Sequence, residues 1–272
     1  MKALLYIISL FSLIFITACN LEKEIDINLP DYESQLVLEC YLEPGQPFAL
    51  SLSRSAAYFD SLPTFDANAL NKIFERGAQV TITHNGKTYQ LEERLVFNPF
   101  TQKLFNYYAT DVVPANYEQS FELKVVTKDG KTIEATTRLL PVIPIDSVVV
   151  EFSEKQDTLA RVLTYLTDPS EQENFYRRML HNNSLDSLPE QDFVLDDRLV
   201  DGDGLLAFGT GFDYTVGDTV INTAFHLEKE YYNFLESVFN ARDSNGNPFG
   251  QPSPINSNLR GTANAIGIFR GL

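Results

Sequence analysis

The chain has 272 residues, with 37 Asp and Glu against 21 Lys and Arg, which gives a formal net charge of −16. Nucleic-acid binding relies on Lys and Arg at phosphates, so this balance argues against a nucleic-acid partner. An acidic chain is also repelled by anionic membrane surfaces, so attachment to a membrane needs an anchor other than basic residues.

Residues 1–18 have the layout of a signal peptide. Met1-Lys2 provides the positive start, and Leu4 to Ile16 is an apolar run too short to span a bilayer, which takes about 20 apolar residues. Thr17-Ala18 before Cys19 resembles a bacterial lipobox, in which the chain is cut before the cysteine and the thiol carries a diacylglycerol. We therefore predict Cys19 as the lipidation site. The alternative is a plain signal peptide with an incidental cysteine.

Residues 19–33 are predicted to be a lipid-anchored tether. Two or three acyl chains hold a protein stably at a membrane, whereas one gives marginal binding. The stretch from Asn20 to Asp26 is acidic and resembles surface-export signals of Bacteroidota lipoproteins, although a solvated tether would look the same. These features predict a lipoprotein that the lipid attaches to the outer membrane and that is exposed at the cell surface.

Residues 34–140 carry the strand patterns of an antiparallel sandwich. Apolar residues alternate from Gln35 to Glu43 and again from Ala78 to His84. Asn85-Gly86 separates the second run from the next one, which is the strongest short-range signal for a β-hairpin. Asp129-Gly130 repeats this arrangement. Strands at this spacing, without a long helical pattern among them, predict an immunoglobulin-like sandwich.

Residues 141–145 are predicted to be a linker, because their two prolines cannot sit in a central strand. Residues 146–272 are predicted to form a second β-rich domain, sandwich-like, with one helix at about 228–242. In that helix, apolar residues recur at helical spacing and a stop signal follows them. The predicted fold class is therefore mainly β, with two β-rich domains.

No enzyme motif is found in the sequence. The three histidines, His84, His181 and His226, are scattered, and no GxSxG, HExxH or paired CxxC pattern occurs. Once Cys19 is lipidated, only Cys40 remains; it lies in an apolar run and is expected to pack as a small hydrophobe, with a reactive thiol as the alternative. The protein is therefore predicted to be non-enzymatic and to need no cofactor.

Two kinds of residue are candidates for binding. The acidic turns Asp201 to Gly204 and Asp243 to Asn247 offer oxygen atoms of the kind that calcium prefers, although tight turns account for the same residues. Trp is absent, so Tyr107-Tyr108 and Tyr231-Tyr232 are the candidates for stacking, with one ring of each pair expected to face inward. Because loops on a rigid sandwich often carry binding residues, the predicted binding residues are Tyr231, Tyr232, Asp201 and Asp203.

Short stretches along nearly the whole mature chain occur in a characteristic order. They are Glu24-Ile25-Asp26, Leu36-Val37-Leu38-Glu39, Leu50-Ser51-Leu52-Ser53-Arg54-Ser55, Gly77-Ala78-Gln79-Val80, Tyr89-Gln90-Leu91, Pro144-Ile145-Asp146-Ser147-Val148, Gly246-Asn247-Pro248-Phe249, Asn258-Leu259-Arg260-Gly261 and Gly267-Ile268-Phe269. No one stretch is specific, but their order and the chain length resemble the Bacteroidota lipoprotein family called domain of unknown function 4249. The plain region Leu206 to Phe208 carries no mark of that family.

The resemblance implies a role but no chemistry. The family has no established activity, so no catalytic residue is carried over. Its members are similar to lipoproteins encoded beside TonB-dependent outer-membrane receptors, which implies that this protein helps such a receptor to capture a nutrient, for example a peptide, a glycan or a chelate. The alternative is a structural or adhesive envelope lipoprotein with no small ligand.

Overall fold

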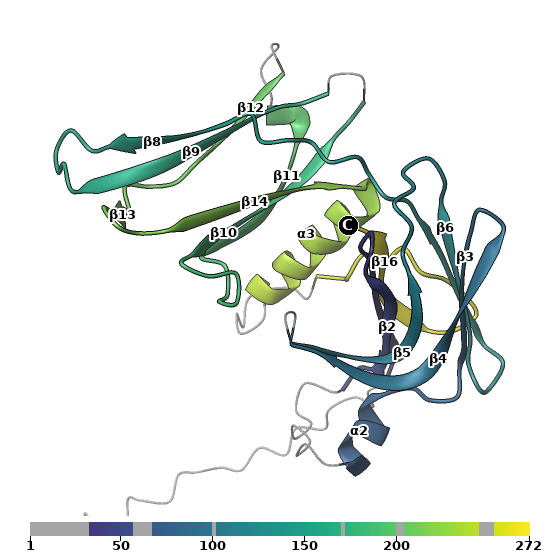
Figure 1. Cartoon of the computed structure of the whole chain (residues 1–272). Coiled ribbons are helices and arrows are strands. Elements are labelled where there is room, and N and C mark those ends of the chain that lie inside the picture. The colour runs from purple at the N-terminus through teal and green to yellow at the C-terminus, as the bar shows by residue number, and fades with distance from the viewer. Residues whose placement is uncertain (1–32, 57–66, 100–101, 170–171, 200–203, 245–252) are drawn as a thin grey trace, which may run out of the picture. The chain divides into compact units, whose positions relative to one another are not determined.

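The computed structural model describes residues 33–56, 67–99, 102–169, 172–199, 204–244 and 253–272. Residues Ser34–Leu272 form one compact unit, which is mainly β (Figure 1). This confirms the predicted mainly β fold class. None of the helices in these residues is long and apolar enough to cross a membrane.

The larger sheet of the described residues has nine strands. It curves until it is nearly closed, so the fold is β-sandwich-like. Its strand order is β15-β7-β6-β3-β4-β5-β2-β1-β16. The strands are β1 (Leu36–Leu42), β2 (Pro47–Arg54), β3 (Gln79–His84), β4 (Lys87–Asn98), β5 (Lys103–Val112), β6 (Phe121–Val126), β7 (Thr132–Thr137), β15 (Arg260–Gly261) and β16 (Ala265–Gly271). Neighbouring strands are antiparallel, except that β16 runs parallel to β1. A short helix, α2 (Ala67–Ile73), lies in the connection between β2 and β3.

Alternation of apolar residues decides which side of this sheet is the core. In β1, Leu38, Cys40 and Leu42 are fully buried inside the curve, while the residues between them face outward. Cys40 is therefore the small core residue that the sequence predicts, and burial raises the pKa of its thiol. The hairpin at Asn85-Gly86 is also confirmed, with β3 and β4 joined by these two residues.

The C-terminal strands complete the larger sheet and bring its two ends together. The backbone N–H of Gly271 donates a hydrogen bond to Oγ1 of Thr137 at 3.0 Å, so β16 reaches the end of β7. At β15, Oγ1 of Thr262 accepts a hydrogen bond from the N–H of Thr132 at 2.9 Å. The last strands of the region predicted as a second domain are thus part of the first sheet, because their edge bonds and core contacts are with residues 36–137.

The chain crosses at residues 141–145 into two smaller facing sheets. One has the order β11-β10-β14, and in the other β9 pairs with β8, β12 and β13. Their strands are β8 (Ser147–Phe152), β9 (Leu159–Thr167), β10 (Phe175–Asn182), β11 (Gln191–Asp196), β12 (Leu205–Gly209), β13 (Tyr214–Thr215) and β14 (Val220–Leu227). Tyr176 of β10 packs between the sheets against Leu166 and Phe208. Residues 141–145 thus connect the larger sheet to these two smaller sheets within the one compact unit.

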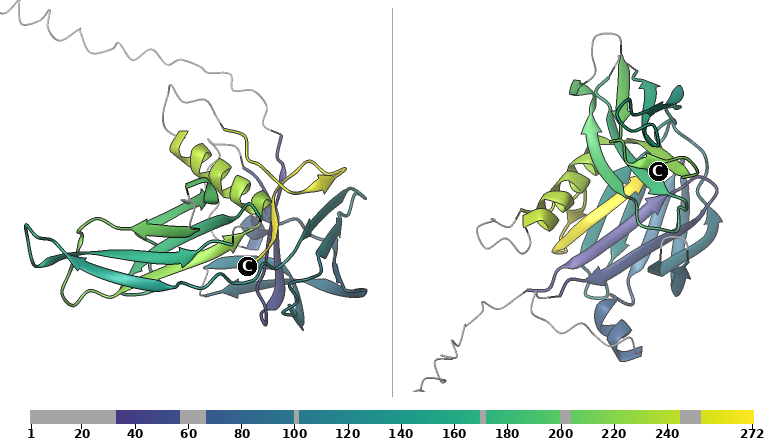
Figure 2. Two further views of the ribbon diagram at one scale, coloured as in Figure 1. Left: turned by 90° about the horizontal axis from the view of Figure 1, so that it is seen from above. Right: turned by 90° about the vertical axis from the view of Figure 1, so that its left-hand side faces the viewer.

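Helix α3 (Lys229–Ser244) joins these parts (Figure 2). It starts directly after β14, close to the predicted span of 228–242. Its buried stripe, which includes Tyr231 and Leu235, packs on Phe175 of β10 and on Ile268 of β16. The outward face of the larger sheet and one face of the β10 sheet are thereby held to the same helix.

Candidate functional site

Several predicted site residues lie outside the residues that the structure describes. These are the lipidation site Cys19 and the acidic turn residues Asp201 and Asp203. The second acidic turn is described only up to Ser244. Within the described ranges, no group of three or more His, Cys, Asp and Glu is placed to hold a metal ion.

The aromatic pair Tyr231-Tyr232 is buried rather than presented to solvent. Tyr231 lies under the guanidinium of Arg270, 3.6 Å from its ring centroid, and its hydroxyl accepts a hydrogen bond from Arg177 at 3.3 Å. The hydroxyl of Tyr232 donates to Asp196 at 3.4 Å. Both rings face inward because α3 is covered by two sheets at once, which the helical spacing alone does not show. Their observed contacts hold α3 to these sheets and leave no open ring face for stacking.

Arg270 is a buried cation at this junction. It lies on the outward face of β16, with its guanidinium also 5.0 Å from the ring centroid of Tyr41. Burial lowers its pKa to about 10, so it stays charged at neutral pH. In the neighbouring pair, Arg177 donates two hydrogen bonds to Asp192, both at 2.7 Å. Aromatic faces therefore stabilise Arg270, and a carboxylate stabilises Arg177.

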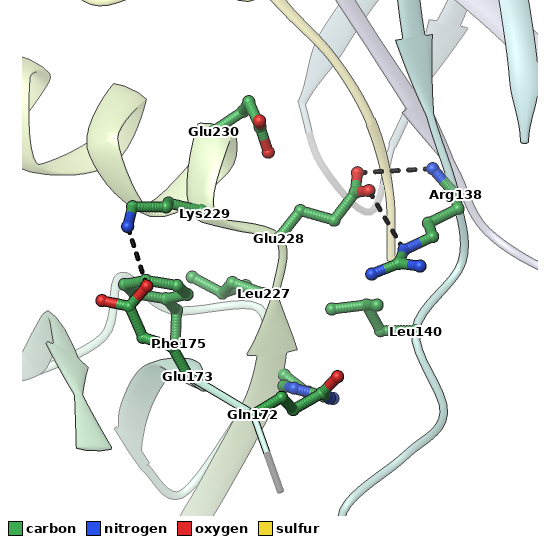
Figure 3. A pocket seen from close by; sticks show the side chains of 10 residues that line it. Arg138, Leu140, Gln172, Glu173, Phe175, Leu227, Glu228, Lys229 and Glu230 are labelled. Atoms are coloured by element: carbon green, nitrogen blue, oxygen red, sulfur yellow. Dashed lines mark hydrogen bonds and ion pairs between the residues drawn. The ribbon is translucent and has the colours of Figure 1, made fainter.

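A small pocket of about 190 Å³ opens where β14 turns into α3 (Figure 3). Glu228 points across it and accepts hydrogen bonds from the hydroxyl of Thr137 and from the N–H of Arg138. Lys229 forms an ion pair with Glu173 at 2.8 Å. Burial raises the pKa of the Glu228 carboxyl. The pocket is smaller than the roughly 300–1,000 Å³ of typical ligand sites, and Glu228 and Lys229 already have protein partners.

Both ring nitrogens of His226, the histidine of this pocket, lie against protein oxygens. Its Nδ1 lies 3.1 Å from the carbonyl oxygen of Pro141, and its Nε2 lies 3.1 Å from Oδ1 of Asn174. Burial lowers the pKa of its imidazole. A neutral imidazole has one N–H and so donates to one of these two oxygens. The contact with Pro141 connects the linker to β14.

Strand β8 has four exposed large apolar residues, more than any other described strand. Its sequence, SVVVEF, has Val148, Val149, Val150 and Phe152 all open to solvent. One edge of β8 pairs with β9, and no described strand pairs with the other edge. An exposed apolar edge strand is unusual, since such strands readily pair with another chain.

The exposure of β8 has a definite cause in the packing. Val148, Val150 and Phe152 are 53%, 55% and 53% exposed, whereas their β9 neighbours on the same face are nearly fully buried. These neighbours are Thr164, Val162 and Ala160, at 1%, 5% and 4%. Because β14 packs over β9, the facing sheet ends one strand too early to cover β8. We call the uncovered residues Val148, Val150 and Phe152 the β8 ledge.

Sequence reasoning predicted the strand but not the ledge. A continuous apolar run such as Val148 to Val150 is typical of a strand buried on both faces. Its exposure depends on which strand of the facing sheet lies over it, and this is a long-range feature. The adjacent linker with its two prolines is the one local signal that the following strand is at an edge.

The protein is thus a mainly β, sandwich-like protein whose one exposed apolar strand, among the described residues, lies at a sheet edge. The family model described as "Domain of unknown function (DUF4249)" matches residues 22–272, so the chain belongs to this family. No curated protein matches the sequence.

Proposed function

We propose that this protein is a non-enzymatic, lipid-anchored accessory protein of the outer membrane, which binds a TonB-dependent receptor and assists its capture of a nutrient. The observation that supports binding of a partner protein is the β8 ledge with its unpaired strand edge. Contiguous exposed apolar surface of this kind marks protein–protein contact sites. The anchor comes from the lipobox-like sequence that ends at Cys19, and the receptor from the resemblance to receptor-associated lipoproteins.

The anchor is tested by labelling. Cells that express the protein with Cys19→Ala should incorporate no labelled acyl chain into it, and the product should stay uncleaved or become soluble. Labelling that persists in this variant would mean that Cys19 is not the lipid site. Protease shaving of intact cells then tests the proposed surface exposure, because a surface lipoprotein is cleaved without lysis.

The partner is tested by affinity purification of the native lipoprotein in mild detergent. A β-barrel receptor is expected to co-purify in roughly equal amount. Its absence in repeated preparations would contradict the accessory role and favour the structural or adhesive alternative. Cys19→Ala provides the control, because a soluble form should recover less of a membrane-embedded partner.

A further inference from the structure

Among the described residues, no strand lies beside β14 on its edge away from β10. Sheet β8-β9 extends one strand beyond sheet β11-β10-β14 on this side, because β14 packs over β9 and nothing in the described part of the chain covers β8. Two contacts place β14 over β9: Nδ2 of Asn222 donates to Oγ1 of Thr164, and Val220 packs against the cluster that contains Val162. We call the position beside β14 and over the β8 ledge the vacant lane.

On the edge of β14 that borders the vacant lane, the backbone groups have no partner among the described residues. The N–H of Asn183 donates to the carbonyl of Thr219 at 2.8 Å, which fixes the alternation of bonds between β10 and β14. In an antiparallel pair, every second residue directs its backbone groups away from the partner. The backbone groups of Val220 and Asn222 therefore point away from β10 and toward the lane, and the residues of β14 from Val220 to His226 are half-buried.

We propose that a β-strand of a partner protein occupies this lane, pairing with the edge of β14 and covering the β8 ledge with its own apolar side chains. Such strand addition obtains affinity from backbone hydrogen bonds and specificity from alternate side chains. Three side chains of the ledge require three apolar residues at alternating positions of the incoming strand. This inference rests on the proposed function only in that the occupant is a protein.

Charge further restricts the occupant to a strand with basic ends. Asp146 lies directly before β8, and Glu154 and Asp157 lie in the loop after it, with Lys155 as the basic residue of that loop. The whole chain carries a formal charge of −16, so a second copy would be repelled. An apolar strand flanked by Lys or Arg complements both the ledge and its acidic ends.

A peptide probe tests this chemistry without the receptor. The peptide is KTVTVTVTK, which presents Val at alternating positions between two Lys residues, and its matched control is ETVTVTVTE. Binding to the full mature chain is measured by fluorescence anisotropy at low salt. The Lys-flanked peptide should bind at least about tenfold more tightly than the Glu-flanked one, and added salt should reduce this difference.

Two variants locate the binding. Val148→Asp combined with Val150→Asp places charge on the ledge and should lower affinity for the Lys-flanked peptide by about tenfold or more, because the lost apolar contact outweighs the added attraction to the peptide ends. Val112→Asp is the matched control, since Val112 is a β5 residue of similar exposure, 52%, on the other sheet. It should bind the peptide as the unaltered chain does. Thermal unfolding confirms that both variants are folded.

The outcomes separate this inference from the proposed function. Equal binding of both peptides, no binding of either, or unchanged binding by the ledge variant would overturn strand addition. A dimer in sedimentation that the ledge variant abolishes would also overturn it, because the occupant would then be a second copy. A receptor that co-purifies equally with the ledge variant contradicts this inference alone, whereas peptide binding without any co-purified receptor contradicts the accessory role alone.

Discussion

At the scale of single residues, two side chains of low exposure, Arg178 and Glu228, carry ionisable groups. Arg178 of β10 is fully buried between the two small sheets, and no described carboxylate pairs with it. It donates hydrogen bonds to Oδ1 of Asn222 at 3.0 Å and to the carbonyl of Gly209 at 3.3 Å, and its Nη2 has no partner among the described atoms. Rings of Phe193 and Phe208 lie 5.8 and 5.7 Å from the guanidinium. Amide oxygens and aromatic rings therefore surround the guanidinium of Arg178.

Arg178→Ala should lower the free energy of unfolding by about 3 kcal/mol, because it leaves a cavity and removes the donor from buried acceptors. Arg178→Met fills most of the cavity and should recover part of this loss. Urea unfolding measures both values. If Arg178→Ala changes stability by less than about 0.5 kcal/mol, the guanidinium contributes little net stability.

The second such residue is Glu228, directly before α3, whose half-buried carboxyl has a pKa raised by desolvation. A raised pKa means that the folded protein holds this proton more tightly than the unfolded chain does, so ionisation of Glu228 reduces stability. This penalty is full above the folded pKa and disappears as the pH falls toward the ordinary value of 4.5.

Comparison with Glu228→Gln isolates this effect, since Gln can still accept the hydrogen bond from Thr137. The stability of the unaltered chain relative to Glu228→Gln should rise as the pH is lowered from about 7 toward 4.5. Urea unfolding of both proteins across this range gives the difference directly. A difference that stays constant, or that falls with acidification, would contradict the raised pKa.

At the scale of elements, two glycines show how differently the same substitution acts in a turn and in a strand. Gly86 has φ +74° in the β3–β4 hairpin, and a Cβ there would meet no atom within 4 Å. Gly267 of β16 has φ +133°, and a Cβ there would lie 1.9 Å from the carbonyl oxygen of Leu38 in β1. Gly86 is needed only for its positive φ. Gly267 is needed for its positive φ and also because β16 and β1 approach too closely there for a side chain.

Gly86→Ala should therefore cost about 1 kcal/mol of stability, from the positive φ alone. Gly267→Ala should cost about 3 kcal/mol or more, because β16 must move away from β1 and disturb the packing of Phe269. Thermal unfolding of the two variants gives the ranking. Equal losses would mean that β16 shifts at little cost.

These elements also show what sequence reasoning can predict. The hairpin at residues 79–91 is encoded locally, by alternation and by a turn dipeptide, so the sequence predicted it. The pairing of β16 with β1 joins residues about 230 positions apart, and its sequence, AIGIFRG, has no local signal for a parallel partner. The burial of Tyr231 and the exposure of Val150 likewise depend on which distant element lies opposite. Local sequence patterns therefore could not predict the candidate site.

At the scale of the whole molecule, the C-terminal residues decide whether the first part of the chain can fold alone. Phe269 of β16 is fully buried in the core of the larger sheet, while Ile268 packs with α3 on the opposite face. The same strand thus belongs to two apolar clusters. Loss of β16 would expose the edge of β1 and open the larger core, although every residue of β1 to β7 remained.

We therefore expect a fragment of residues 34–140 to lack a cooperative thermal transition, whereas the mature chain unfolds in a single transition. A second fragment, in which a flexible Gly-Ser linker joins residue 140 to residues 258–272, restores β15 and β16 and should regain cooperative unfolding. Near-ultraviolet circular dichroism follows the tyrosine packing in all three. A cooperative transition of the first fragment at the temperature of the intact chain would show that residues 34–140 are an independent domain, and that β16 adds to a sheet that is already stable.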